Sequence, residues 1–186
     1  MFEVVVVAVI SFCIVSVLWF TLKTGISPMP SSLQVRLVVQ KASEQANDGS
    51  IVDLGSGWGT LLFAMAKQYP DRQLIGYELS WLPWAYSRIV VAVCRMQHVK
   101  IYRSSFLDAD LSASSLLLCY LHPEGMQALQ QKLSDDQHVH ALLISSTFAF
   151  SDISPSHTIR VDDLYQTPVY LYQLKKEDGE YVRLAT

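Results

Sequence analysis

Short apolar runs alternate with helical patterns along most of the chain. The apolar runs are IVDL from Ile51, QLIGYEL from Gln73, VKIYR from Val99, SLLLCYL from Ser115 and HALLISSTFAF from His140. Residues 60–68, 81–97 and 124–133, which lie between these runs, carry helical spacing. Strands separated by helices predict an α/β fold, in which helices cover both faces of a mostly parallel sheet.

Both ends of this alternating region depart from its rhythm. Residues 33–46 predict a further helix before the first strand, and Ser31 or Ser32 is placed to cap it. After Phe150, the segment SDISPSH is too short to form a crossover helix. The runs TIRVDDLY and PVYLYQLKK then follow with a turn at 166–168 between them. This pattern predicts a terminal antiparallel β-hairpin.

The N-terminus has a different pattern, because the 19 residues from Val4 to Leu22 carry no charge. As a helix this run would be roughly 28 Å long, enough to cross the core of a bilayer. A cleaved signal peptide would need a basic start, and a buried core helix is disfavoured because the run has no polar face. We therefore predict one transmembrane helix at 1–23, a linker at 24–32 and a single domain at 33–186.

Basic residues predict the orientation of that span. Lys23, Arg36 and Lys41 follow it, and no lysine or arginine precedes it. By the positive-inside rule, the chain is expected to be a single-pass membrane protein whose domain lies on the cytoplasmic side.

The composition excludes some partners for the domain. The net charge of −3 gives no reason to expect a nucleic-acid binder. The three cysteines and five histidines show no metal-ligand spacing. We therefore expect no nucleic-acid partner, no metal site and reduced thiols.

The strongest chemical signal is the stretch IVDLGSGWGT, where a strand meets a helix. Its glycines are Gly55, Gly57 and Gly59, a G-x-G-x-G spacing. The dinucleotide pattern G-x-G-x-x-G would need a glycine at position 60, where this chain has Thr60. No Walker lysine follows the loop either, so a phosphate cradle is disfavoured. Glu78 ends the second predicted strand, where an acid is placed to accept hydrogen bonds from a ribose.

The combination D-x-G-x-G-x-G plus an acid after the second strand resembles the class I S-adenosylmethionine-dependent methyltransferases. This resemblance implies a Rossmann-like fold with a seven-stranded type of sheet and S-adenosylmethionine as cofactor. It implies that Gly55 and Gly57 lie against the cofactor, that Asp53 orients its amino end and that Glu78 holds the ribose hydroxyls. The rest of the implied cofactor set is Ser56, Gly59 and, after the third strand, Ser105.

The segments PMPSS, VDLGSGWGT, GYELS and AYSR resemble a narrower group. These are the membrane-anchored protein-lysine methyltransferases that modify the ATP synthase c subunit and the adenine nucleotide translocase, together with bacterial relatives. The chain departs from this group in three places. Trp58-Gly59-Thr60 replaces Asp-Gly-Arg, Ser105 stands where an aspartate is usual, and CYLHP replaces Asn-Pro-Pro-Tyr. Trp58 could shield the methionine end of the cofactor or pack on the helix that begins beside it, and we favour packing.

The end of the fourth strand supplies the acceptor-site candidates, because ligands of open α/β sheets bind at the carboxyl edge. Cys119, Tyr120 and His122 lie there, and we nominate Tyr120 as a pocket wall and His122 as a proton acceptor. The alternative is that His122 and Pro123 only start the next helix.

We accordingly expect a methyltransferase that modifies a protein lysine at a membrane surface, with a protein partner that can itself be membrane-embedded. Two alternatives stay open. The acceptor could be a small or lipid-linked molecule, or the chain could bind the cofactor without turnover.

Overall fold

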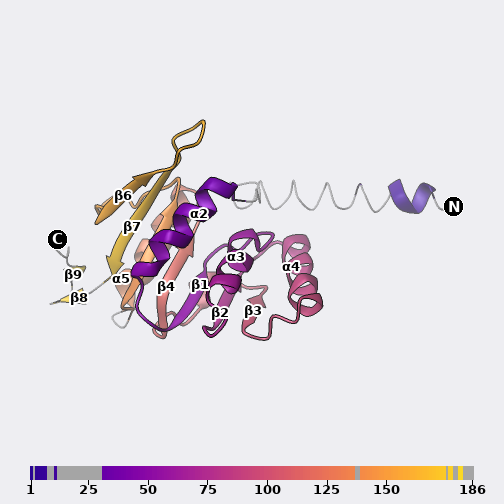
Figure 1. The fold of residues 1–186 in the computed structure, drawn as a ribbon, viewed down its shortest axis with the longest axis horizontal. Helices are drawn as coiled ribbons and strands as arrows, with labels where there is room; N and C mark the ends of the chain where they lie inside the picture. Colours follow the sequence, from indigo (N-terminus) through magenta and orange to yellow (C-terminus); the bar gives the residue numbers. More distant parts are fainter. Residues whose placement is uncertain are drawn as a thin grey trace.

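The computed structural model describes residues 1, 3–7, 11, 31–136, 139–174, 176–177 and 180–181. Its body is a seven-stranded sheet in the order β3-β2-β1-β4-β5-β7-β6 with helices on both faces (Figure 1). The strands are β1 (Ser50–Asp53), β2 (Leu74–Tyr77), β3 (Val99–Tyr102), β4 (Ser114–Cys119), β5 (Ala141–Ser146), β6 (His157–Arg160) and β7 (Pro168–Leu174). The helices are α2 (Leu33–Ala42), α3 (Thr60–Gln68), α4 (Trp81–Val93) and α5 (Pro123–Asp135), with 3-10 turns η1 (Ser43–Gln45) and η2 (Phe106–Asp108). A separate two-stranded ladder joins β8 (Lys176–Glu177) to β9 (Glu180–Tyr181).

One strand of the main sheet runs against its neighbours. β7 pairs antiparallel with both β5 and β6, whereas the pairs among β1 to β5 are parallel. The predicted terminal hairpin is therefore confirmed as β6–β7, with β7 inserted next to β5. The register places Asp53 opposite Gly76 of β2 and Leu118 of β4. The carboxyl ends of the central strands consequently meet at one edge.

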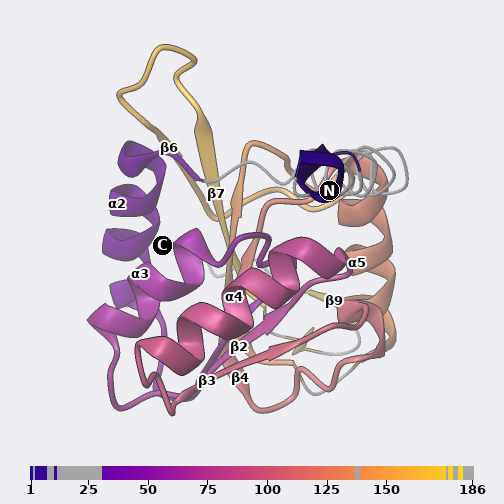
Figure 2. The ribbon, with the colours of Figure 1, turned by 90° about the vertical axis from the view of Figure 1, so that its right-hand side faces the viewer.

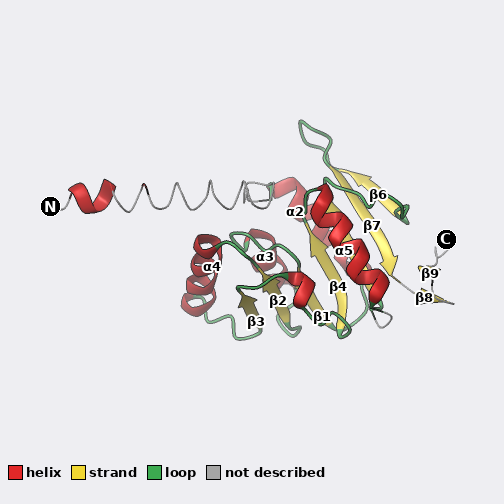
Figure 3. Cartoon of the chain, turned by 180° about the vertical axis from the view of Figure 1, so that it is seen from behind, coloured by secondary structure: helices red, strands yellow, loops and turns green. Residues whose placement is uncertain are grey.

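Side chains of the central strands alternate between two hydrophobic layers, as the pleat requires. Ile51 and Leu116 join the layer formed with α2 and α3. Val52 and Leu117 join the layer formed with α5. Figures 2 and 3 show α2, α3 and α4 on one face of the sheet and α5 on the other. Burial on both faces explains why these strands are continuously apolar in sequence.

The helix ends show where local sequence signals hold and where one fails. Ser32 caps α2, because its Oγ accepts from the Val35 N–H at 3.2 Å, as predicted. The helix predicted at 81–97 instead ends at Val93, so that prediction extended too far. Arg95 adopts a left-handed φ of 51°, and the Met96 N–H donates to the Val91 carbonyl at 3.1 Å. This is the geometry of a Schellman stop, which usually uses glycine and so left no signal in the sequence.

The predicted transmembrane helix and linker lie mostly outside the described residues. Within the described ranges, every helix is too short or too polar to span a bilayer.

Candidate active site

The loop from β1 to α3 is fastened to the strands on both sides of β1. The Leu54 N–H donates to the Leu118 carbonyl of β4, and the Ser56 N–H donates to the Tyr77 carbonyl of β2, both at 2.9 Å. The Gly59 N–H closes the turn onto the Ser56 carbonyl at 2.7 Å. The loop therefore has a fixed backbone at the carboxyl edge of the sheet.

Gly57 lies at the centre of this loop and is held from two elements. Its N–H donates to Glu78 Oε2 at 2.8 Å, and its carbonyl accepts from Ser87 Oγ of α4 at 3.3 Å. Its φ of 51° favours glycine. A Cβ at Gly57 would meet no atom within 4 Å, so the space beside this backbone is open to a ligand.

The other two glycines serve different purposes. Gly59 has a φ of 75°, and a Cβ there would come within 2.5 Å of the Phe63 ring. Glycine is thus favoured at position 59 by the left-handed backbone and by the close Phe63 ring. A Cβ on Gly55 would only touch Leu121 at 3.4 Å, an ordinary contact. The three glycines therefore differ: Gly57 faces open space, Gly59 packs against a ring, and Gly55 has room for a small side chain.

Glu78 links the loop to the end of β2. Besides accepting from Gly57, its carboxylate accepts from the Ser80 N–H through Oε1 at 2.6 Å. An ionised carboxylate offers about four lone-pair sites, so acceptor capacity remains for two ribose hydroxyls. The residues at this edge therefore fit the predicted cofactor.

Asp53 is buried at the end of β1, behind the loop. Its pKa is raised from 3.8 to about 7, chiefly because burial disfavours the charged carboxylate. The Gly55 N–H, 3.4 Å from Oδ1, lowers the pKa, and the nearby charge of Glu78 raises it. A cationic ligand next to this carboxyl would favour its ionised form. Strongly shifted carboxyl groups of this kind are typical of functional sites.

The two serines predicted as cofactor contacts are placed differently. The Ser56 hydroxyl is buried without a hydrogen-bond partner among the described residues. It would lie 2.9 Å from a Cβ on Gly76, so it faces β2. Ser105 Oγ accepts from the Leu107 N–H at 3.2 Å and caps η2. Their predicted contacts with the cofactor stay predictions.

A second cluster of side chains lies at the carboxyl ends of β4 and β5. The Tyr120 and Phe148 rings lie 5.9 Å apart. Thr147, between β5 and Phe148, has a φ of 75°, which is a genuine outlier for a β-branched residue. The Phe148 N–H donates to the Ser146 carbonyl at 3.0 Å, which closes the tight turn. Strained backbone of this kind clusters at ligand sites.

The remaining acceptor-site candidates differ in exposure. Cys119 is buried, and burial raises the pKa of its thiol to about 12. Its Sγ lies 3.9 Å from Met126 Sδ. This thiol belongs to the core. Of the three candidates at the end of the fourth strand, Cys119 therefore does not present its side chain to an acceptor. His122 precedes α5, has Pro123 at the first helical turn and places Nε2 3.4 Å from Glu124 Oε2. The helix-starting role is thus realised, and the proton-accepting role stays a prediction.

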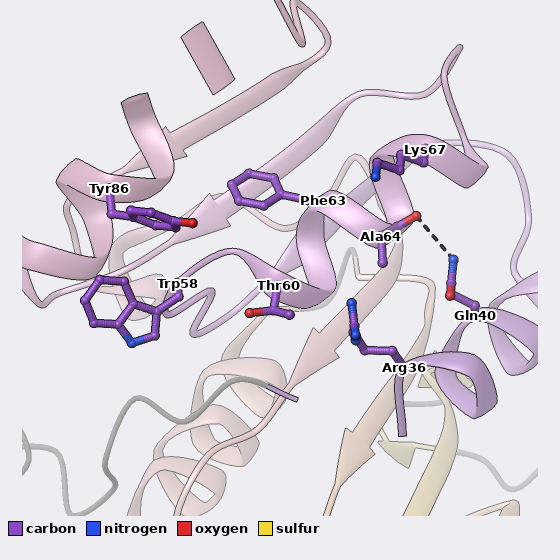
Figure 4. Close-up of a pocket in the computed structure, with 8 residues that line it drawn as sticks. All are labelled: Arg36, Gln40, Trp58, Thr60, Phe63, Ala64, Lys67 and Tyr86. Atoms are coloured by element: carbon purple, nitrogen blue, oxygen red, sulfur yellow. Dashed lines mark hydrogen bonds between the residues drawn. The ribbon is translucent and has the colours of Figure 1, made fainter. Parts of the chain in front are cut away.

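A cavity of about 630 Å³ lies beside the loop, between α2, α3 and α4 (Figure 4). Trp58 meets Tyr86 of α4 edge-on, with ring centroids 5.5 Å apart. The favoured packing role of Trp58 is therefore realised against α4, although α3 was expected. The predicted cofactor contacts are absent from the cavity lining, which comprises Arg36, Gln40, Trp58, Thr60, Phe63, Ala64, Lys67 and Tyr86.

Two residues of the site escaped prediction from the sequence. Ser87 is fully buried and holds the Gly57 carbonyl. The sequence feature that could have identified Ser87 is a single hydroxyl on an otherwise apolar face of α4. Thr147 left no signal, because its left-handed backbone depends on tertiary contacts. Among the described residues, no group of three or more potential metal ligands is present.

Comparisons with known proteins agree with this geometry. The family model described as "ANTKMT methyltransferase domain" matches residues 53–157, more than half of the chain. The lysine N-methyltransferase of the ATP synthase c subunit from Homo sapiens is 35% identical over 112 residues, which cover 59% of this chain and 46% of that protein. A protein-lysine N-methyltransferase of Saccharolobus islandicus is 22% identical over 152 residues, 78% of this chain and 90% of that protein. The chain spans about half the length of the ATP synthase methyltransferases that it matches.

One solved structure supports the fold. An RNA methyltransferase from Salinibacter ruber, in complex with S-adenosyl-L-homocysteine, superposes with a TM-score of 0.70 at 20% identity. The match covers 80% of this chain and 95% of that chain. At this identity the likeness shows a Rossmann-like methyltransferase fold and carries no information on the acceptor.

Proposed function

Because the chain belongs to the family of the ANTKMT methyltransferase domain, we propose that it transfers a methyl group from S-adenosylmethionine to a protein lysine. The observation that carries the proposal is the link between Glu78 and Gly57, at 2.8 Å, inside the segment that the family model matches. The named lysine methyltransferases among its relatives support the acceptor class.

S-Adenosylmethionine would supply an activated methyl group, which the amine nitrogen accepts as the carbon–sulfur bond breaks. Glu78 would hold the ribose hydroxyls with its remaining lone pairs, and Asp53 would face the cationic end. The open side of Gly57 would admit the ligand against the backbone. Much of the rate enhancement then comes from alignment and exclusion of water.

The acceptor amine must be neutral to react. A free lysine has a pKa of about 10.4, so its deprotonation near pH 7.4 costs roughly 4 kcal/mol. The Tyr120 and Phe148 rings, 5.9 Å apart, would form an apolar wall that lowers this pKa. His122, which is 24% exposed, is the proton acceptor nominated from the sequence.

Membrane attachment through residues 1–23, with the domain on the cytoplasmic side, is part of the same proposal. The uncharged run from Val4 to Leu22 and the basic residues after it support this orientation. Attachment would concentrate the enzyme near membrane-embedded acceptors. Protease protection of sealed vesicles tests the orientation directly.

Transfer of tritiated methyl groups to membrane fractions tests the activity. We expect label in a protein band and methyl-lysine after its hydrolysis, both lost in Glu78→Ala and kept in the surface control Arg160→Gln. Label in the lipid or small-molecule extract would instead support the alternative acceptor class. Binding of S-adenosylhomocysteine without transfer to any fraction would support a cofactor-binding protein without turnover.

A further inference from the structure

The surface formed by α4 and the following strand is basic, although the chain is acidic. From Leu79 to Leu107 there is no aspartate or glutamate, while Arg88, Arg95, Lys100 and Arg103 lie in this segment. The whole chain has a net charge of −3. This segment therefore carries four basic residues and no acidic residue, and it includes the edge strand β3 (Figure 1).

The outer face of α4 is apolar and at least half exposed. Tyr86, Ile89 and Val93 follow helical spacing and are 50%, 62% and 75% exposed. The opposite side of the helix buries Pro83 and Ser87. An apolar stripe flanked by arginines on a surface helix is typical of a segment that lies in a membrane interface.

Two guanidinium groups lie beside one ring of this helix, and neither has a carboxylate partner within the described part of the chain. The Arg88 and Arg103 guanidinium carbons lie 5.9 and 5.8 Å from the centroid of the same ring, that of Trp84. Among the described residues, no carboxylate lies within ion-pair distance of either guanidinium group. Each guanidinium group offers several N–H donors to an external anion. Phosphate suits arginine because the guanidinium donates two parallel hydrogen bonds.

Trp84 fixes this arrangement in the fold. Its indole Nε1 donates to the Ile101 carbonyl of β3 at 3.3 Å, and its ring packs against the core. Arg95 lies at the left-handed stop of α4 and is exposed. Arg88 therefore lies in the second half of α4, Arg95 just after its end and Arg103 just after β3.

We propose that the α4 face docks on a membrane that contains anionic phospholipid. Tyr86, Ile89 and Val93 enter the boundary between headgroups and acyl chains. Arg88, Arg95 and Arg103 contact the headgroup phosphates. This docking rests on the membrane-surface action proposed above and deepens it. Because Arg103 directly follows β3, its contact would place the carboxyl end of this edge strand at the bilayer surface.

Cys94 is a native reporter for this docking, because it is exposed at the end of α4 whereas Cys119 is buried. The full chain with Cys13→Ser is labelled with a nitroxide at Cys94 and combined with nanodiscs. The discs contain phosphatidylcholine alone or phosphatidylcholine mixed with phosphatidylserine. Collision with oxygen and with a water-soluble nickel chelate then reports whether the label is immersed.

We expect immersion with phosphatidylserine and an aqueous label with phosphatidylcholine alone. An N-terminal anchor contributes equally on both discs, so it does not produce this difference. Arg88→Gln, Arg95→Gln and Arg103→Gln should each weaken docking about fivefold. Ile89→Ser with Val93→Ser should abolish immersion, and circular dichroism checks that these surface variants fold.

Matched controls come from the opposite edge of the sheet. Arg160→Gln and Leu164→Ser remove an exposed charge and an exposed apolar side chain there, and both should leave immersion unchanged. A label that stays aqueous on anionic discs overturns the proposal. Equal immersion on both discs, or immersion that needs an added protein, overturns it as well. Methyl transfer assayed on the same samples tests the proposed function separately, since transfer can proceed with α4 in water.

Discussion

The carboxyl ends of β1 and β2 are built differently from those of β4 and β5. At β1 and β2, the loop at residues 54–59 is held by backbone hydrogen bonds and by one carboxylate, Glu78, that accepts two backbone N–H groups. At β4 and β5, the site consists of two aromatic rings and a strained turn at Thr147. Under the proposed function, the first region binds the cofactor and the second faces the acceptor. The two regions should therefore respond differently to mutation.

The largest expected effect is at Glu78. Glu78→Ala removes the anchor of the Gly57 N–H and the acceptors for the ribose, so S-adenosylhomocysteine affinity should fall about 100-fold. Calorimetric titration measures this change. Arg160→Gln is the control at the far edge of the sheet, and an affinity for Glu78→Ala within about threefold of wild type would contradict the role of this carboxylate.

Mutation of the acceptor region should lower methyl transfer and leave the affinity for S-adenosylhomocysteine nearly unchanged. Tyr120→Leu with Phe148→Leu removes the aromatic wall, and we expect kcat/KM for methyl transfer to fall about 10- to 100-fold. The affinity for S-adenosylhomocysteine should stay within about twofold of wild type. Stopped-time radiometric assays and calorimetry on the same protein make the comparison. A parallel loss of both quantities would show that the two regions are not separate.

The pH dependence sharpens the description of the cofactor region. The pKa of Asp53 is about 7 in the folded chain, and a cationic ligand binds best when this group is ionised. Affinity for S-adenosylmethionine should therefore rise about tenfold from pH 6 to pH 8. Asp53→Asn should remove most of this dependence. A wild-type affinity that stays constant, or falls, over this range would contradict the assignment.

Asp53 should make the free energy of unfolding fall as pH rises, whereas it makes the affinity for S-adenosylmethionine rise. Its folded pKa lies above the unfolded value of 3.8, so the folded chain binds more protons between about pH 4 and pH 7. The free energy of unfolding should therefore decrease as pH rises through this window. Urea titrations should show Asp53→Asn to be more stable than wild type at pH 8, with the difference shrinking toward pH 4.

The smallest effect is expected at Ser87, a positioning residue. Ser87→Ala removes one neutral hydrogen bond to the Gly57 carbonyl, so affinity for S-adenosylhomocysteine should fall about threefold to tenfold. Ser87→Thr, which keeps the hydroxyl, should recover part of the loss. Amide exchange at Gly57 should accelerate in the alanine variant; unchanged exchange and affinity would leave Ser87 with a packing role alone.

The sequence predicted the position of the glycine loop at the sheet edge because the signals for the strands and the loop are local. Asp53, the glycines and Glu78 each follow or end a strand, and strand ends share one edge of a parallel sheet. The start and end of α3 were likewise predicted from the pattern at 60–68.

The acceptor region was harder to predict because its features depend on distant contacts. The strain at Thr147 requires the Pro168 carbonyl of β7, which accepts from the Thr147 N–H at 2.8 Å. Cys119 lies directly before Tyr120 but points into the core, because strand side chains alternate. The end of α4 at an arginine in a left-handed conformation also lacked a sequence signal.

The most direct test of the central claim is an amide chemical-shift map of the 15N-labelled protein as S-adenosylhomocysteine is added. The loop at β1 and the end of β2 should respond most, with Gly55, Gly57 and Ser80 foremost. Thr147 and the cavity residues Gln40 and Lys67 should change little. The largest shifts around Gln40 and Lys67, with Gly57 and Ser80 unmoved, would place the ligand in the cavity between α2 and α3 and contradict the account.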